Sequence, residues 1–169
     1  IGSWFKQSGR REDVILATKI TGLSRMTYVR DADVSWTRHT KDQVDEAVHK
    51  SLQRLQTDYI DLYQLHWPDR AAPTFGSKMR AKDYTYAYEP FEEILAHLQS
   101  HIEAGRIRHI GVSNETAFGV MRFLAESNAR GLPRMASIQN AYNLVNRTFE
   151  DGGLEEVCVH EKVSLLAYS

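Results

Sequence analysis

Hydrophobic residues along the chain fall into five short runs, each followed by a polar or helical stretch or by the end of the sequence. Runs of this length and composition predict strands, at residues 14–20, 59–67, 107–113, 136–141 and 164–169. Between them, apolar residues recur at helical spacing and predict helices at 44–55, 90–102, 118–125 and 154–158. Strands that alternate with helices are typical of a parallel sheet with right-handed crossovers.

Local signals set the expected helix ends. Thr40 and Gln43 stand three residues apart, which predicts a capping box at the start of a helix. Pro90 fits a first helical position. Gly105 and Gly131 follow the next two helical stripes and predict their carboxyl ends.

Two architectures fit this order of elements: an open doubly wound sheet, and an eight-stranded α/β barrel. The doubly wound sheet normally carries a glycine-rich phosphate loop after an early strand. Neither G-x-G-x-x-G nor G-x-x-x-x-G-K-[S/T] occurs in the chain. The pattern therefore favours the (β/α)8 TIM barrel by a small margin.

Length, charge and composition exclude several classes of protein. A length of 169 residues suits one domain, and a formal net charge of −1 gives no basic surface for nucleic acid. No apolar run approaches the roughly 20 residues that a membrane span needs. The single cysteine, Cys158, excludes an internal disulfide and indicates a reducing compartment, so we expect a cytoplasmic protein. The sequence does not indicate an oligomeric state.

Polar and aromatic residues stand at the end of every predicted strand, where both architectures place their functional groups. These residues are Lys19, His66 with Trp67, Ser113 with Asn114, Gln139 with Asn140, and Tyr168 with Ser169. Taken singly, a lysine there is usually solvated, a histidine is more often structural, and Asn114 is equally a favoured N-cap. Together, the five strand ends place polar groups at the same end of the sheet or barrel, which favours a functional site there.

Other chemistries lack their motifs. The histidines share no metal-ligand spacing, and neither H-E-x-x-H nor C-x-x-C occurs, so no metal site is predicted. G-x-S-x-G is absent, as are paired carboxylates at strand ends.

Five segments, ILATKITG, TDYIDLYQLHWPD, GRIRHIGVSNE, SIQNAYNLVNR and SLLAYS, together resemble the aldo-keto reductase superfamily. The most similar branch holds the bacterial Tas-type proteins and is related to the potassium-channel β-subunits. The resemblance implies a (β/α)8 barrel, of which residues 1–169 form a single partial domain covering about strands 3 to 7. It also implies NADPH as cofactor and a small-molecule aldehyde or ketone as substrate.

The resemblance also implies roles for the residues at the strand ends. It makes Lys19 and His66 catalytic, Trp67 substrate-binding, and Ser113, Asn114, Gln139, Tyr168 and Ser169 cofactor-binding. In this scheme the lysine ammonium lowers the pKa of an acid tyrosine, which is near 10 in model peptides. The histidine orients and polarises the carbonyl, and the aromatic ring of Tyr168 stacks on the nicotinamide.

The sequence departs from the family pattern at both ends. The acid tyrosine and the aspartate that pairs with the lysine would precede Ile1, and the residues selecting the 2′-phosphate would follow Ser169. We therefore expect an internal segment of a longer protein, inactive alone. Two other classes stay open: a non-enzymatic nucleotide-binding barrel that acts as a regulatory or scaffold subunit, and a barrel lyase or isomerase with Lys19 as Schiff base. The loops 21–39 and 69–89 are expected to roof the pocket, with Trp36, Phe75 or tyrosines lining it.

Overall fold

The computed structural model describes residues 1–31, 33–84 and 87–169. Its centre is one sheet of five parallel strands that lie side by side in chain order. They are β1 (Ala17–Ile20), β2 (Ile60–Leu65), β3 (Ile107–Ser113), β4 (Met135–Ala141) and β5 (Ser164–Tyr168). This order has no reversal of direction, whereas the order of a doubly wound sheet reverses at its switch point.

The predicted strands are confirmed, with small shifts at their ends. β1 begins at Ala17 rather than at residue 14, and β2 ends at Leu65. His66 and Trp67 therefore follow the strand instead of closing it. The prediction for β3 is correct at both ends.

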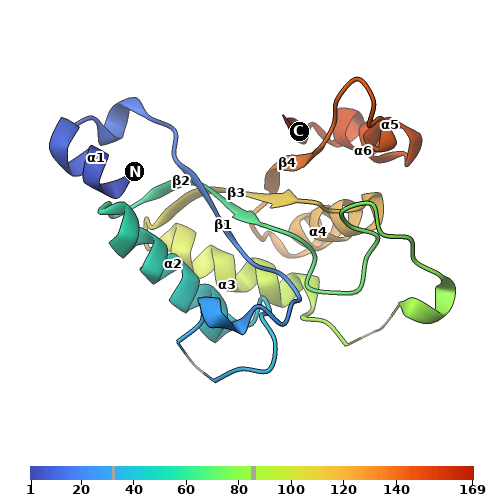
Figure 1. Cartoon of the computed structure of the whole chain (residues 1–169), viewed down its shortest axis with the longest axis horizontal. Coiled ribbons are helices and arrows are strands. Elements are labelled where there is room, and N and C mark those ends of the chain that lie inside the picture. The colour runs from blue at the N-terminus through green and yellow to red at the C-terminus, as the bar shows by residue number, and fades with distance from the viewer. Residues whose placement is uncertain (32, 85–86) are drawn as a thin grey trace.

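Helices cover one face of the first three strands (Figure 1). The helices of the chain are α1 (Gly2–Ser8), α2 (Lys41–Leu55), α3 (Phe91–Glu103), α4 (Ala117–Arg130), α5 (Thr148–Asp151) and α6 (Leu154–Glu161). In Figure 1, α2, α3 and α4 lie below the sheet, and β4 rises to α5 and α6 at the upper right. The upper face of β1, β2 and β3 carries no helix across its middle.

The hydrophobic core lies between the sheet and these helices. Side chains from both layers are at most 1% exposed there: Ile60, Tyr63, Ile110 and Ile138 of the strands, and Val44, Val48, Leu95, Leu98 and Leu124 of the helices. Burying one large apolar side chain contributes roughly 1.5–3 kcal/mol. The helix-covered face therefore stabilises the sheet and fixes where its carboxyl ends lie.

The capping box predicted for α2 is wrong. Thr40 is the N-cap residue, but its side chain makes no capping hydrogen bond. Gln43 is engaged by the preceding loop: its Oε1 accepts from Arg38 N at 2.9 Å, and its Nε2 donates to the Trp36 carbonyl at 3.1 Å. Gln43 therefore anchors the 21–39 loop to α2.

The other predicted helix ends are close to the structure. Pro90 is the N-cap residue of α3 rather than its first helical residue. Gly105 follows Ala104, the C-cap of the same helix. Gly131 is the C-cap of α4 in the left-handed region, as predicted.

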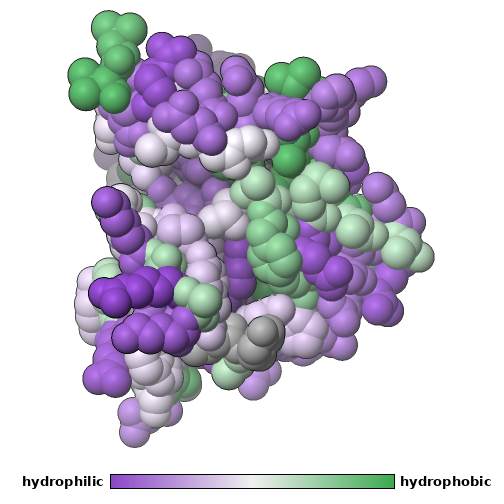
Figure 2. Space-filling view, turned by 90° about the vertical axis from the view of Figure 1, so that its right-hand side faces the viewer, coloured by the Kyte–Doolittle hydropathy of each residue, from purple (hydrophilic) through white to green (hydrophobic). Residues whose placement is uncertain are grey.

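Most of the surface on the side that carries α5, α6 and the 69–89 loop is hydrophilic, with hydrophobic residues in separate small patches (Figure 2). Within the described part of the chain, no helix combines the length and the apolar character needed to cross a membrane.

Candidate active site

A cleft of about 260 Å³ opens at the carboxyl ends of the strands. Its lining consists of Lys19, His66, Phe75, Ser113, Asn114, Gln139 and Tyr168. The sequence predicted all of these as strand-end residues except Phe75, which it placed in a loop over the pocket. The structure thus brings residues from all five strands or their ends to one place.

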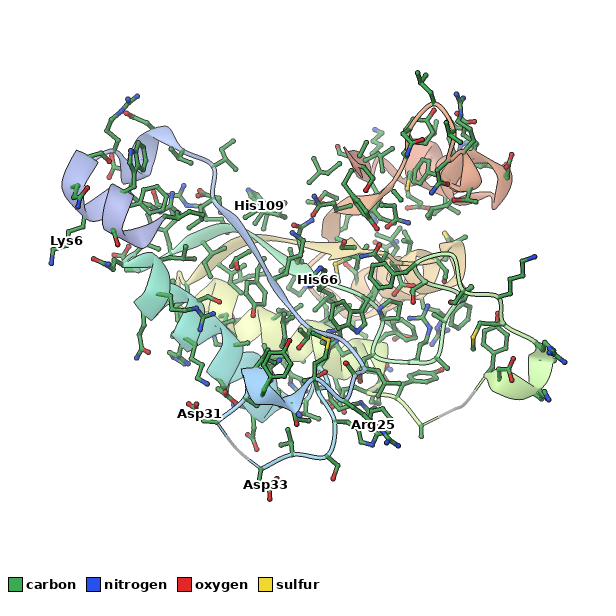
Figure 3. All side chains as sticks on the ribbon, in the orientation of Figure 1. Lys6, Arg25, Asp31, Asp33, His66 and His109 are labelled. Atoms are coloured by element: carbon green, nitrogen blue, oxygen red, sulfur yellow. The ribbon has the colours of Figure 1, made fainter. Side chains whose placement is uncertain are left out.

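Strand register explains this convergence. Lys19 lies beside Gln64, and Ser113 lies beside Gln139. Because side chains alternate between the two faces of a strand, His66 shares the face of Gln64. Figure 3 labels His66 near the centre of the sheet, with His109 on the side away from α2 and α3.

Asn114 has a different role from the helix cap that the sequence also allowed. Its backbone is in the left-handed region, with φ of 50°, which asparagine tolerates better than most residues. The N-cap of α4 is Thr116, whose side chain accepts from Gly119 N at 3.3 Å. Asn114 Nδ2 instead donates to the His66 carbonyl at 2.9 Å, and Oδ1 accepts from the Tyr168 hydroxyl.

Ser113 and Gln139 form the next part of the wall. Ser113 Oγ donates to the Gln139 carbonyl at 2.7 Å, and Asn114 N donates to the same oxygen at 3.0 Å. The side-chain Oε1 of Gln139 is buried without a hydrogen-bond partner among the described residues. An unpaired buried polar atom is costly, so this amide is suited to a ligand donor.

Burial sets the electrostatics of the two titratable groups. It lowers the pKa of the Lys19 ammonium below its usual value. The pKa of the His66 imidazole is also lowered, first by burial and then by the nearby Lys19 charge. The imidazole is thus mostly neutral at neutral pH, and both groups can give hydrogen bonds to an oxygen in the cleft.

Two predicted site residues lie beside the cleft rather than on its lining. Trp67 has its ring centre 4.6 Å from that of His66, and its Nε1 donates to the Leu23 carbonyl at 3.1 Å. Ser169 is exposed and its carbonyl accepts from Asn143 Nδ2 at 2.8 Å. Neither position tests the role assigned to the residue.

The 69–89 loop reaches the cleft, as expected, through Phe75. Phe75 is 66% exposed, and its ring centre lies 6.1 Å from that of Trp67 in an edge-on arrangement. Phe75 also borders an adjoining hollow of about 490 Å³. Trp36 packs instead against Arg25, with the guanidinium 4.8 Å from its ring centre. Tyr86, one of the loop tyrosines, lies outside the described residues.

A buried ion pair behind the cleft was missed by sequence reasoning. Arg70 donates to both carboxylate oxygens of Glu115, at 2.9 and 2.6 Å, and the two side chains are 8% and 3% exposed. The Glu115 carbonyl also accepts from Asn140 Nδ2 at 3.0 Å. The pair therefore fixes the junction that follows Asn114. Its partners lie 45 residues apart on loops, so no local pattern indicates it.

The sequence of the chain matches the model of a known enzyme family. The family model described as "Aldo/keto reductase family" matches residues 1–169. The chain therefore belongs to the aldo-keto reductase family.

Individual relatives agree with this assignment. Protein tas of Escherichia coli (strain K12) is 45% identical over 170 residues, which cover 100% of this chain and 48% of that protein. The aldo-keto reductase yakc of Schizosaccharomyces pombe, whose name specifies NADP(+), is 29% identical and matches 100% of this chain and 42% of its own length. The solved structure of the thermostable aldo-keto reductase Tm1743, in complex with the inhibitor epalrestat, has a TM-score of 0.72 at 28% identity. It matches 99% of this chain and 48% of its own.

Each of these matches leaves part of the relative uncovered. The chain spans about half the length of the curated relatives it matches. The resemblance to the Tas-type branch is confirmed by the identity to Protein tas. The chain is thus homologous to NADP-dependent aldo-keto reductases.

Proposed function

We propose that the protein carrying this chain is a cytoplasmic NADPH-dependent oxidoreductase that reduces aldehyde or ketone carbonyls of small molecules. In this proposal the chain supplies about strands 3 to 7 of an eight-stranded barrel. The supporting observation is the cleft that gathers Lys19, His66, Asn114, Gln139 and Tyr168.

Two features of the cleft support the proposal of a nicotinamide cofactor. Tyr168 offers a flat ring, and Gln139 Oε1 is buried without a partner among the described residues. The carboxamide of the nicotinamide has both hydrogen-bond donors and an acceptor. It would be held by the side-chain amide of Gln139 and by the unused lone pair of Asn114 Oδ1. NADPH, when bound, supplies the hydride. Ser113 keeps Gln139 in place through its 2.7 Å hydrogen bond to the backbone, and Ser169 would contact the pyrophosphate.

Lys19 and His66 would act on the carbonyl oxygen, which gains negative charge during reduction. Donors placed before the reaction stabilise that charge most in a site from which water is excluded. His66 would donate a neutral N–H to the oxygen, and Trp67 would limit the substrate on the side of His66. The Lys19 ammonium would lower the pKa of a neighbouring acid by favouring its ionised form.

Tyr168 is unsuited to be the proton donor. Its hydroxyl already donates to Asn114 Oδ1, and burial raises its pKa. We therefore propose that the acid tyrosine, and the aspartate that pairs with Lys19, come from another part of the complete protein. On this proposal the 169-residue chain has no reductase activity alone.

The test is NADPH consumption with simple aromatic and aliphatic aldehydes by the complete protein. Lys19→Met and His66→Gln should each lower kcat by about a hundredfold or more, while His160→Gln, at an exposed position of α6, should not. Quenching of NADPH fluorescence without turnover of any carbonyl would favour the regulatory subunit instead. Trapping of a substrate on Lys19 by borohydride would favour the lyase.

A further inference from the structure

The side chain of Asn114 connects the end of β2 to the end of β5. Its Nδ2 donates to the His66 carbonyl at 2.9 Å and to Ser113 Oγ at 3.2 Å. Its Oδ1 accepts from the Tyr168 hydroxyl. Tyr168, Asn114 and His66 thus form one continuous hydrogen-bonded chain across the mouth of the cleft.

The His66 backbone needs this connection because it lies beyond the regular sheet. Pairing between β2 and β3 ends with Leu65 beside Val112. On one side, His66 N donates to the Ile20 carbonyl at 2.8 Å. On the other side, its carbonyl receives the Asn114 side-chain amide where the next strand would otherwise supply a backbone N–H. Asn114 therefore extends the sheet by one residue, and that residue carries the imidazole.

We propose that the Tyr168 hydroxyl is a positioning group, which acts through Asn114 to hold His66 in place against the carbonyl of the substrate. This inference rests on the proposed reductase function. It assigns separate roles to the two parts of the Tyr168 side chain: the ring faces the cofactor, and the hydroxyl orients Asn114.

The hydrogen-bonding capacity of Asn114 supports this division. A side-chain amide has two N–H donors and two acceptor lone pairs on oxygen. Both donors are used by His66 and Ser113, and one lone pair is used by Tyr168. The protein therefore sets the orientation of the amide before any ligand binds. One lone pair of Asn114 Oδ1 remains for a ligand, and Asn114 has no donor left for a ligand oxygen.

The first experiment separates the hydroxyl of Tyr168 from its ring in the complete protein. Tyr168→Phe should lower kcat roughly 3- to 10-fold, the effect of one hydrogen bond, and change the affinity for NADPH by no more than about twofold. Tyr142→Phe is the matched control, because that hydroxyl donates to Glu150 Oε1 at 2.5 Å and does not line the cleft. Equal kcat values for the two variants would overturn the proposal.

A double-mutant cycle then tests whether the chain of hydrogen bonds acts as a unit. Asn114→Gly removes the side chain and keeps the positive φ that glycine adopts freely. If Tyr168 acts through Asn114, Tyr168→Phe should have no further effect on kcat in the Asn114→Gly background. Full additivity of the two changes would show that the hydroxyl acts by another route, contrary to the proposal.

A measurement without catalysis separates this inference from the proposed function. In ¹⁵N-asparagine-labelled protein, the Asn114 side-chain amide signal is identified by its loss in Asn114→Gly. Tyr168→Phe should shift that signal, and Tyr142→Phe should leave it unchanged. An unshifted signal in Tyr168→Phe would contradict the connection itself. Failure of the unsubstituted protein to reduce any carbonyl, with the shift observed, would instead reject the reductase function.

Discussion

At the amino end of the sheet the charged groups are paired with one another, whereas at the carboxyl end several titratable groups lack such partners. At the amino end, the Asp61 carboxylate accepts from Leu16 N at 3.0 Å and from Arg11 and Arg108 at 2.8 Å each. Both guanidinium groups also lie over the Tyr59 ring, at 3.9 and 4.0 Å from its centre. The charges at this end therefore stabilise one another.

At the carboxyl end, burial acts on titratable groups that lack such partners. No carboxylate among the described residues opposes the lowering of the pKa of Lys19 or of His66. His39 is 1% exposed, and neither of its ring nitrogens has a hydrogen-bond partner in the described structure. In barrel enzymes the amino end serves stability and the carboxyl end serves chemistry, and the contrast between the paired Asp61 and the unpaired Lys19 and His66 follows that division.

The largest expected effect is at the amino end. Asp61→Ala should lower the free energy of unfolding by about 3–5 kcal/mol, because it leaves Arg11 buried without its carboxylate. Urea denaturation of the 169-residue chain measures this loss. Asp13→Ala is the matched control: its pair with Arg10 at 2.8 Å is 57% and 64% exposed, so the expected loss is about 0.5 kcal/mol. Similar losses for both variants would contradict the contrast between the two ends.

The same carboxylate should make the amino end sensitive to acid. Burial raises the pKa of Asp61, but the hydrogen bonds from Leu16 N, Arg11 and Arg108 outweigh it, so the net pKa is lowered below 3.8. A lowered folded-state pKa stabilises the protein above the unfolded value, and this contribution is lost as pH falls through the folded value. Asp61→Asn should therefore lose less stability than the unsubstituted chain on acidification below about pH 4.

His39 should give the carboxyl end its own pH dependence, over a higher range. Burial lowers its pKa from 6.5 to about 4; Asp69 opposes this shift, and Arg30, Arg38 and Arg70 add to it. Between these values the unfolded chain binds more protons, so stability rises with pH. Acidification from pH 6.5 to 4 should therefore cost about 3 kcal/mol.

Replacement of His39 tests that dependence directly. His39→Leu loses no side-chain hydrogen bond of the described structure, so its stability should vary less over the same pH range. Chemical denaturation at a series of pH values measures the slope. His160→Gln, at an exposed position, should keep the full slope. If His39→Leu kept it as well, another group would control acid stability.

The Arg70–Glu115 pair is an exception at the carboxyl end, and it should behave like the amino end. Glu115→Gln keeps the shape of the side chain and one acceptor, but removes the charge that both Arg70 nitrogens contact. We expect a loss of about 2 kcal/mol in the free energy of unfolding. Glu126→Gln, whose partners Arg122 and Arg130 are 47% and 55% exposed, should lose about 0.5 kcal/mol. A loss no greater for Glu115→Gln would mean that the buried pair contributes little.

The sequence predicted the features that depend on short-range patterns. The hydrophobic run at residues 107–113 correctly predicted both ends of β3, and Gly131 correctly predicted the end of α4. Since the carboxyl ends of parallel strands meet at one edge of a sheet, Lys19, His66 and Gln139 could be placed in one cleft from their positions alone.

Long-range packing accounts for what the sequence did not predict. Gln43 was assigned to a capping box because nothing local shows that the 21–39 loop folds back onto α2. Asn114 could be a helix cap by its residue type, and only the neighbouring strands show that it joins His66 to Tyr168. These contacts connect segments that are distant along the chain, which periodicity does not describe.

The smallest expected effect is the change in stability when a single charge, that of Lys19, is removed. Lys19→Met removes an ammonium that burial disfavours, so the unfolding free energy of the 169-residue chain should stay unchanged or rise by up to about 1 kcal/mol. Lys50→Met is the matched variant, because Lys50 pairs with Asp31 at 2.6 Å and Glu46 at 2.7 Å, and it should lower the unfolding free energy slightly.

Urea denaturation near neutral pH compares the two lysine variants. The lowered pKa of Lys19 means that stability rises with pH between its folded value and 10.5, and Lys19→Met should lack that rise. Equal losses in the two variants would show that Lys19 is stabilised by a partner within the chain. In the complete protein, the proposed aspartate should reverse the sign, so that Lys19→Met becomes destabilising there. The reversal would show that Lys19 acquires a paired charge only when the rest of the barrel is present.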